Sequence, residues 1–185
     1  FIRERKREMT RSYLSGGEQT TINSTITELF PALAFNTSAK FKSSSELETY
    51  IRNLNLSGVR ASKTFVNSGN VDAATKAIDK LDLIRPSIKD TKLKNAIGIL
   101  NYLYEYNKKR KIEKVIWGYR EKPRGVPNNH AGDIFIFHAD KKVKPNIVGI
   151  SLKAGTKSSK EPKLNSYVGT TSVSYTHLRA HETNQ

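Results

Sequence analysis

The chain has 185 residues, a length that suits one globular domain or one domain with a helical extension. Its 32 Lys and Arg residues against 17 Asp and Glu residues give a net charge of +15, which favours a polyanionic partner, most often nucleic acid. The absence of cysteine excludes disulfides, thiolate metal sites and cysteine nucleophiles. No apolar run approaches the roughly 20 residues of a membrane helix and no signal peptide is visible, so we expect a cytoplasmic protein without a membrane partner.

The N-terminal half is predicted to be helical. Apolar residues recur at helical spacing in four stretches, residues 22–35, 43–54, 71–81 and 89–109. Pro31 interrupts the first stretch and indicates that this helix is divided there. The last stretch is the most strongly periodic, and it ends in the cations Lys108 to Lys111, which suit the negative end of a helix dipole.

The C-terminal half changes to β-branched and aromatic residues. Three strands are predicted, at residues 114–120, 132–138 and 146–153. Their connections are too short for helical crossovers, so an antiparallel meander is expected. A further helix is predicted within residues 156–171. The fold class is therefore α/β or, more narrowly, α+β, with a helical region over 1–88 and a core over 89–171.

The last residues, 172–185, fit nothing before them and resemble a translated sequencing adapter. We expect this tail to be non-native, with the native chain breaking near Thr171. The start at Phe1, within a charged stretch, likewise suggests a truncated chain.

Two of the predicted strands carry a candidate site. Asp133 opens an apolar strand, and Ser151 and Lys153 share one face of the next strand because side chains alternate with period two. Taken singly, Asp133 would suit a turn and Lys153 a solvated strand end. An acid beside a lysine in a basic protein instead indicates phosphodiester hydrolysis: carboxylates hold Mg²⁺ or Mn²⁺, and a lysine orients water and contacts the phosphate.

A helix, a strand, a strand with Asp and a strand with x-Lys resemble the core of the PD-(D/E)xK nuclease superfamily, over about residues 90–170. The resemblance implies a restriction-endonuclease-like core, with Asp133 as a metal ligand and Lys153 as the motif lysine. Ser151 stands where the superfamily usually has Asp or Glu. The superfamily core usually continues with a helix and a strand after the lysine, so the resemblance also implies an incomplete core.

The missing acid has several candidates. Superfamily members often carry a glutamate on the helix before the first strand, and Glu105 lies on such a helix. Glu121, at the end of the first strand, is the second choice. Asp140 is disfavoured because it lies roughly 23 Å from Asp133 along the strand, at about 3.3 Å per residue.

The sequence therefore predicts a metal-dependent nuclease, an endonuclease or exonuclease that acts on DNA. The alternative is a non-catalytic nucleic-acid-binding or structural protein on the same fold, which the loss of the acid at Ser151 supports. Phosphate contacts are expected from cations near the strands, although some would simply be solvated. These candidates are Lys109, Arg110, Arg120, Arg124, Lys157 and Lys160. The sequence gives no indication of the oligomeric state.

Overall fold

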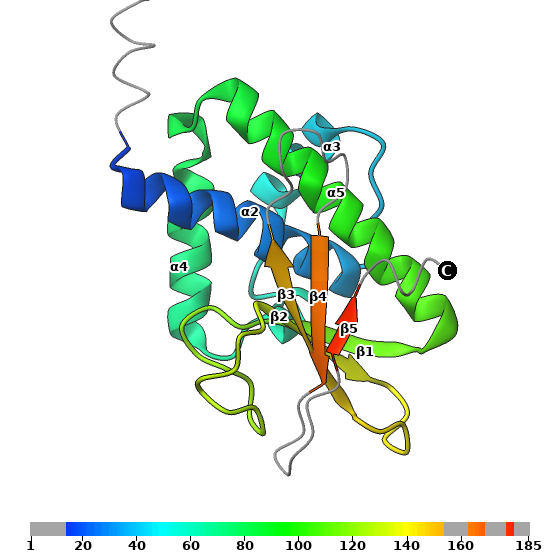
Figure 1. Ribbon diagram of the computed structural model, residues 1–185. Helices are drawn as coiled ribbons and strands as arrows, with labels where there is room; N and C mark the ends of the chain where they lie inside the picture. The colour runs from blue at the N-terminus through cyan, green and yellow to red at the C-terminus, as the bar shows by residue number, and fades with distance from the viewer. Residues whose placement is uncertain (1–13, 154–162, 169–176, 180–185) are drawn as a thin grey trace, which may run out of the picture.

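The predicted succession of helices and then strands is confirmed. The computed structural model describes residues 14–153, 163–168 and 177–179, and side chains for residues 14–152. Its helices are α2 (Gly16–Asn36), α3 (Ser44–Asn53), α4 (Ser68–Asp79) and α5 (Pro86–Lys109), with the short 3₁₀ helices η1 (Ala61–Thr64) and η2 (Leu81–Leu83). The strands are β1 (Ile112–Trp117), β2 (Ile134–His138), β3 (Ile147–Lys153), β4 (Lys163–Val168) and β5 (His177–Arg179) (Figure 1). The chain is thus an α+β fold.

The strands form one sheet in the order β1-β2-β3-β4-β5, and each neighbouring pair is antiparallel. The predicted three-strand meander corresponds to β1, β2 and β3. Trp117 pairs with Ile134, and Ile134 pairs with Ile150, which fixes the register across these three strands.

The prediction of a helix within residues 156–171 is wrong where the structure describes this segment. Lys163 to Val168 form β4, which pairs along β3 from Val148 to Lys153. Leu164, Tyr167 and Val168 have a spacing that a helix would accept. Pairing with β3 prevails because it satisfies the backbone groups that an unpaired edge strand would expose. Residues 156–162 and 169–171 lie outside the described part.

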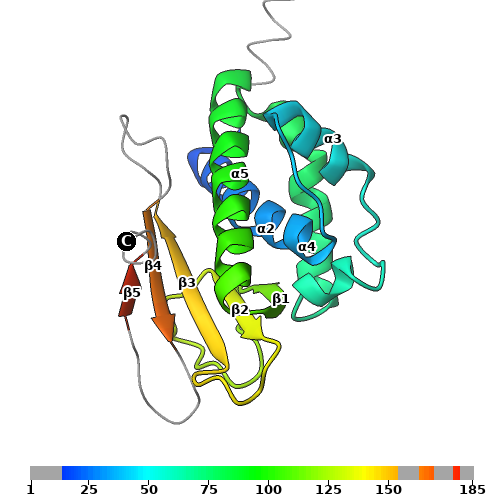
Figure 2. The ribbon, with the colours of Figure 1, turned by 90° about the vertical axis from the view of Figure 1, so that its right-hand side faces the viewer.

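The helices gather on one side of the strands (Figure 2). A single hydrophobic core joins α2, α5 and the sheet, and its members include Ile26, Phe30, Leu93, Ile99, Trp117, Ile136 and Val148. Residues from 1–88 and from 89–171 therefore pack into the same core. Within the described residues, no helix is long and apolar enough to cross a membrane.

Helix α2 runs through Pro31 without a break, so the prediction of a division there is wrong. Proline removes one helical hydrogen bond, the one that the Thr27 carbonyl would accept, at a cost of about 3 kcal/mol. Pro31 and the residues from Leu29 to Ala34 are buried, and α2 packs against both α5 and β1. This burial offsets the lost bond.

The opposite face of the sheet is covered by the loop between β1 and β2. Gly149 makes close approach possible, since a Cβ at this position would come within 2.5 Å of His130 Cε1 and 2.9 Å of Phe135 Cε1. His130 and Phe135 are both buried. The face that carries Gly149 is therefore packed, whereas Val148 and Ile150 face the helices as part of the core.

Candidate active site

Asp133 lies directly before β2 and is tied to both neighbouring strands. Its backbone N–H donates to the Ile150 carbonyl at 2.8 Å, and its carbonyl accepts from the Gly118 N–H at 2.9 Å. Its carboxylate Oδ2 accepts from the Leu152 N–H at 2.7 Å, one residue before the end of β3. The side chain is half-buried and held in one position.

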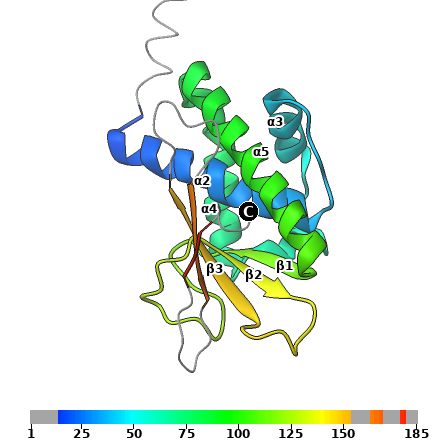
Figure 3. The ribbon, with the colours of Figure 1, turned by 45° about the vertical axis from the view of Figure 1, so that its right-hand side comes forward.

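A second carboxylate, that of Glu28, meets Asp133 from helix α2. The two side chains share a hydrogen bond, and both line a cavity of about 300 Å³. The end of β3 lies beside α2 in Figures 1 and 3, which explains how a helix from the start of the chain reaches this strand. The structure thus joins Glu28 and Asp133 although they are far apart in sequence.

The environment of Glu28 favours its protonated form. Burial raises the pKa of Glu28 from 4.5 to about 8, and the negative charge of Asp133 and the hydrogen bond to its carboxylate act in the same direction. The Lys122 ammonium partly opposes this rise. At neutral pH the Glu28 carboxyl therefore holds its proton.

Most of the residues that line the cavity are polar. Helix α2 contributes Thr20, Asn23, Ser24 and Thr27, and helix α5 contributes Lys92, Asn95 and Ile99. Leu152 closes the cavity from β3. Lys92 is half-buried and brings a cation to the same space as the two acids, so the cavity can hold an anion as well as a cation.

Lys122 holds the loop beneath the site. Its Nζ donates to the Gly132 carbonyl at 2.9 Å and to the Gly118 carbonyl at 3.3 Å, and it lies 5.6 Å from the centroid of the Phe135 ring. These contacts join the residues on either side of the loop, next to Asp133. Lys122 therefore supports the backbone that positions Asp133.

Ser151 and Lys153 are placed differently from Asp133. Ser151 is only 4% exposed and does not line the cavity, because it shares the face of β3 that carries the packed residue Gly149. The backbone of Lys153 ends β3, but its side chain lies outside the described residues. Ser151 is thus a buried residue behind the cavity.

Glu105 is not brought to Asp133. It is exposed on α5, its carboxylate pairs with Lys108 at 2.8 Å, and that interaction lowers the pKa of Glu105. The carboxylate that the structure brings to Asp133 is that of Glu28. Glu121 is exposed and bonded to Asn67, and Asp140 belongs to the hairpin at the far end of β2, so neither of them lines the cavity.

The predicted phosphate-contacting residues fall into three groups. Lys109 and Arg110 are exposed at the end of α5. Arg120 and Arg124 are exposed on the loop between β1 and β2, and the Arg120 guanidinium lies 4.9 Å from the centroid of the Tyr119 ring. Lys157 and Lys160 lie outside the described residues.

One signal in the sequence could have identified Glu28. It is the only ionisable residue between Glu18 and Lys40, within a run that is otherwise apolar or small and polar. A single acid in such a run, on a helix that must bury most of its surface, has to find a polar partner. Ser24, four residues before Glu28, and Thr20, four residues before Ser24, are polar residues at helical spacing on the same face.

The two carboxylates suit a hard divalent cation. Among the residues that the structure describes, no group of three or more His, Cys, Asp or Glu side chains could hold a metal ion. Mg²⁺ needs fewer, since it usually keeps several waters and binds through one or two carboxylates together with substrate phosphate oxygens. Asp133 and Glu28 fit that requirement, and binding of a dication would displace the proton of Glu28.

Comparison with known proteins found no matching family model, no matching curated protein and no matching solved structure.

Proposed function

We propose that this protein is a metal-dependent nuclease that hydrolyses phosphodiester bonds in DNA, with its active site at the cavity between α2, α5 and the sheet. The observation that carries the proposal is the Glu28–Asp133 carboxyl pair lining a cavity that also receives Lys92. Two carboxylates and a nearby lysine are the side chains that metal-assisted phosphodiester hydrolysis requires.

In this proposal each residue has a distinct role. Asp133, fixed by the Leu152 N–H, and Glu28, on the rigid helix α2, would hold Mg²⁺ or Mn²⁺. The metal, when bound, lowers the pKa of coordinated water and neutralises charge on the phosphoryl group. Lys92 would contact a non-bridging phosphate oxygen and orient the attacking water. The PD-(D/E)xK resemblance gives the second role to Lys153, but Lys153 shares the strand face of Ser151, whereas the cavity borders Leu152.

The order α5–β1–β2–β3 also supports the finer proposal of a restriction-endonuclease-like core related to the PD-(D/E)xK superfamily. Asp133 opens the second strand and Lys153 ends the third, as that resemblance implies. Glu28 would take the place of the acid that Ser151 lacks. Such an enzyme would act in the cytoplasm, where nucleic acid is accessible.

One observation favours the non-catalytic alternative. Ser151 occupies the expected acid position but is buried on the packed face of β3, away from the cavity. A protein that binds nucleic acid without cleaving it would need only the fold and the cations.

The decisive experiment is cleavage of supercoiled plasmid and single-stranded DNA with Mg²⁺, with Mn²⁺ and with EDTA. Asp133→Asn is the main variant, because an amide oxygen can still accept from the Leu152 N–H and preserve the fold. We expect metal-dependent cleavage by the wild type, and its loss in Asp133→Asn and Lys92→Ala. Equal cleavage by wild type and both variants would contradict the proposal, and binding without cleavage would favour the alternative.

A further inference from the structure

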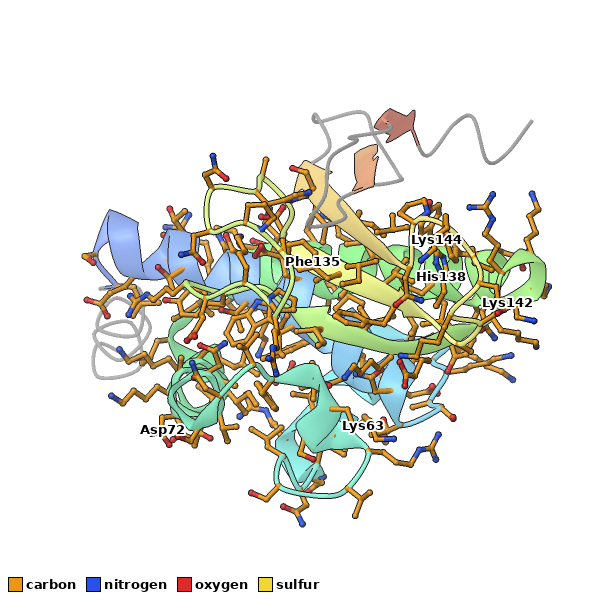
Figure 4. The ribbon with its side chains drawn as sticks, turned by 90° about the horizontal axis from the view of Figure 1, so that it is seen from below. Lys63, Asp72, Phe135, His138, Lys142 and Lys144 are labelled. Carbon is orange, nitrogen blue, oxygen red and sulfur yellow. The ribbon has the colours of Figure 1, made fainter. Side chains whose placement is uncertain are left out.

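The end of the sheet opposite the acid pair gathers cations from three segments, and all of them except the half-buried Lys114 are exposed. These are the end of α5 with the residues after it, strand β1, and the hairpin between β2 and β3. We call this surface the basic end. It comprises Lys108, Lys109, Arg110, Lys111, Lys114, Lys141, Lys142 and Lys144. Figure 4 shows Lys142 and Lys144 beside the end of α5.

Specific contacts hold the hairpin against the helix. The Ala139 N–H donates to the Lys111 carbonyl at 2.9 Å. The buried ring of His138 stacks on Tyr106 at 5.8 Å between centroids, and the Tyr106 hydroxyl lies 2.7 Å from His138 Nε2. The other ring nitrogen of His138 lies 3.0 Å from the Pro145 carbonyl. The basic end is therefore a built surface and not a chance overlap of loose segments.

The acids nearby do not balance this charge. The basic end holds eight cations and three acids, Glu105, Glu113 and Asp140, so its net charge is 8 − 3 = +5. Glu105 pairs with Lys108 at 2.8 Å and Glu113 with Lys141 at 3.8 Å, and all four side chains are largely exposed. Exposed ion pairs of this kind contribute little to stability.

Local structure explains only some of these cations. Lys108 and Lys109 occupy the last turn of α5, where cations stabilise the helix dipole. The hairpin lysines have no such reason, and their mutual repulsion opposes folding. Asp140 supports the turn through its Oδ1, which accepts from the Lys142 N–H at 2.9 Å, and so it holds a lysine in the hairpin. A polyanion bound here would remove the repulsion.

We propose that the basic end binds the phosphate backbone of nucleic acid and anchors long strands one strand length away from the acid pair. Strand β2 separates the two surfaces by five residues, or roughly 17 Å at about 3.3 Å per residue. That distance corresponds to about five base pairs of duplex, at about 3.4 Å per phosphate along one strand. The anchoring of a substrate rests on the proposed nuclease function, whereas binding itself does not.

The test measures binding without cleavage. Fluorescence anisotropy of a labelled 20-base-pair DNA duplex in EDTA gives Kd over a series of salt concentrations. The variant is Lys142→Gln with Lys144→Gln, and the matched control is Lys63→Gln with Lys76→Gln, which removes the same charge from exposed positions on η1 and α4. Circular dichroism checks that both proteins remain folded.

We expect the hairpin variant to weaken binding by about 5- to 10-fold and to lower the slope of log Kd against log salt by about 1 to 2, since each phosphate contact contributes about 0.9. The control should change Kd by less than about 2-fold, because a loss of distant charge is screened beyond about 10 Å. Equal effects of the two variants, an unchanged slope, or tighter binding to anionic phospholipid vesicles than to DNA would overturn the proposal.

A second measurement separates this proposal from the proposed function. If the protein cleaves DNA, the hairpin variant should raise KM for long DNA by about 5-fold and leave hydrolysis of bis(p-nitrophenyl) phosphate unchanged. If the hairpin variant binds DNA as wild type does while Asp133→Asn abolishes cleavage, only the proposal that the basic end anchors DNA is overturned. If the hairpin variant binds DNA more weakly than wild type but wild type cleaves no DNA, only the proposed nuclease function is overturned.

Discussion

The two ends of strand β2 treat charge in opposite ways. Directly before its first residue, the half-buried Asp133 meets Glu28 in a cavity, and burial keeps Glu28 protonated. Beyond its last residue, the hairpin exposes Lys141, Lys142 and Lys144 to solvent. Charge that is withdrawn from water is costly and shifts a pKa, whereas exposed charge is cheap and screened by salt.

This contrast separates the site of the proposed chemistry from the site of the proposed nucleic-acid binding. The acid end is shaped by a few short contacts, and one altered atom there should change both metal binding and stability. The basic end acts through summed charge, so a single substitution there should change little. The following predictions test that difference, from the largest expected effect to the smallest.

The largest effect should come from Glu28, with the other helix glutamate, Glu105, as its control. Glu28→Gln is expected to reduce metal-dependent DNA cleavage by at least about 100-fold, since it removes a proposed ligand, whereas Glu105→Gln should change it by less than about 2-fold. Initial rates of plasmid nicking with Mg²⁺ measure both. Similar rates for the two variants would place the second acid elsewhere.

The acid pair should also make stability depend on pH. An ordinary glutamate ionises near pH 4.5, but Glu28 in the folded protein holds its proton until about pH 8. The stabilisation is therefore fully present below pH 4.5 and is lost as the pH rises through 8. Since one pKa unit corresponds to about 1.4 kcal/mol, we expect wild type to lose about 4 kcal/mol more than Glu28→Gln between pH 5 and pH 9.

Urea denaturation in EDTA at both pH values measures this difference. The Glu28→Gln variant serves as the reference for all other titrating groups. Parallel pH profiles for the two proteins would show that Glu28 ionises normally, and a raised pKa for Glu28 would then be ruled out.

The buried contact at the basic end should have a moderate effect. Tyr106→Phe removes the hydroxyl beside His138 Nε2 and leaves a buried ring nitrogen unsatisfied, at a cost of about 1–2 kcal/mol. A double-mutant cycle with His138→Leu, followed by urea denaturation, isolates the pairwise energy. An interaction energy near zero would mean that the ring stacking alone holds the hairpin.

The smallest effect should come from the exposed pair of Lys141 and Glu113. Lys141→Ala should change the free energy of unfolding by less than about 0.5 kcal/mol, because the pair is 3.8 Å apart and solvated. Thermal unfolding at low salt measures it. A loss comparable with that of Tyr106→Phe would show that the basic end is tied into the core through its charges.

Much of the fold followed from local patterns. The stripe of Leu93, Ala96 and Leu100 predicted α5, and the β-branched run at 114–120 predicted β1. Two predictions failed for non-local reasons. Burial of α2 against α5 and β1 outweighs the break at Pro31, and the edge of β3 recruits β4 from a segment with helical spacing.

The candidate site divided in the same way. The position of Asp133 was evident because an acid at the start of an apolar strand is unusual, and period-two alternation correctly separated the core residues Val148 and Ile150 from Ser151. Alternation could not tell which face of β3 borders the cavity. The loop between β1 and β2 covers the Ser151 face, so the cavity lies on the face of Leu152.

Composition and periodicity were sufficient for the basic character, the order of elements as far as β3 and the acid at the entrance of β2, since each depends on residues close together in the chain. The partner of that acid depends on which helix crosses the end of β3. Glu105 lies near the strands in sequence, but Glu28, more than 100 residues before Asp133, forms the hydrogen bond with it. Packing of α2 on α5 and the sheet decides this, because burial of apolar surface selects helix positions without regard to distance along the chain.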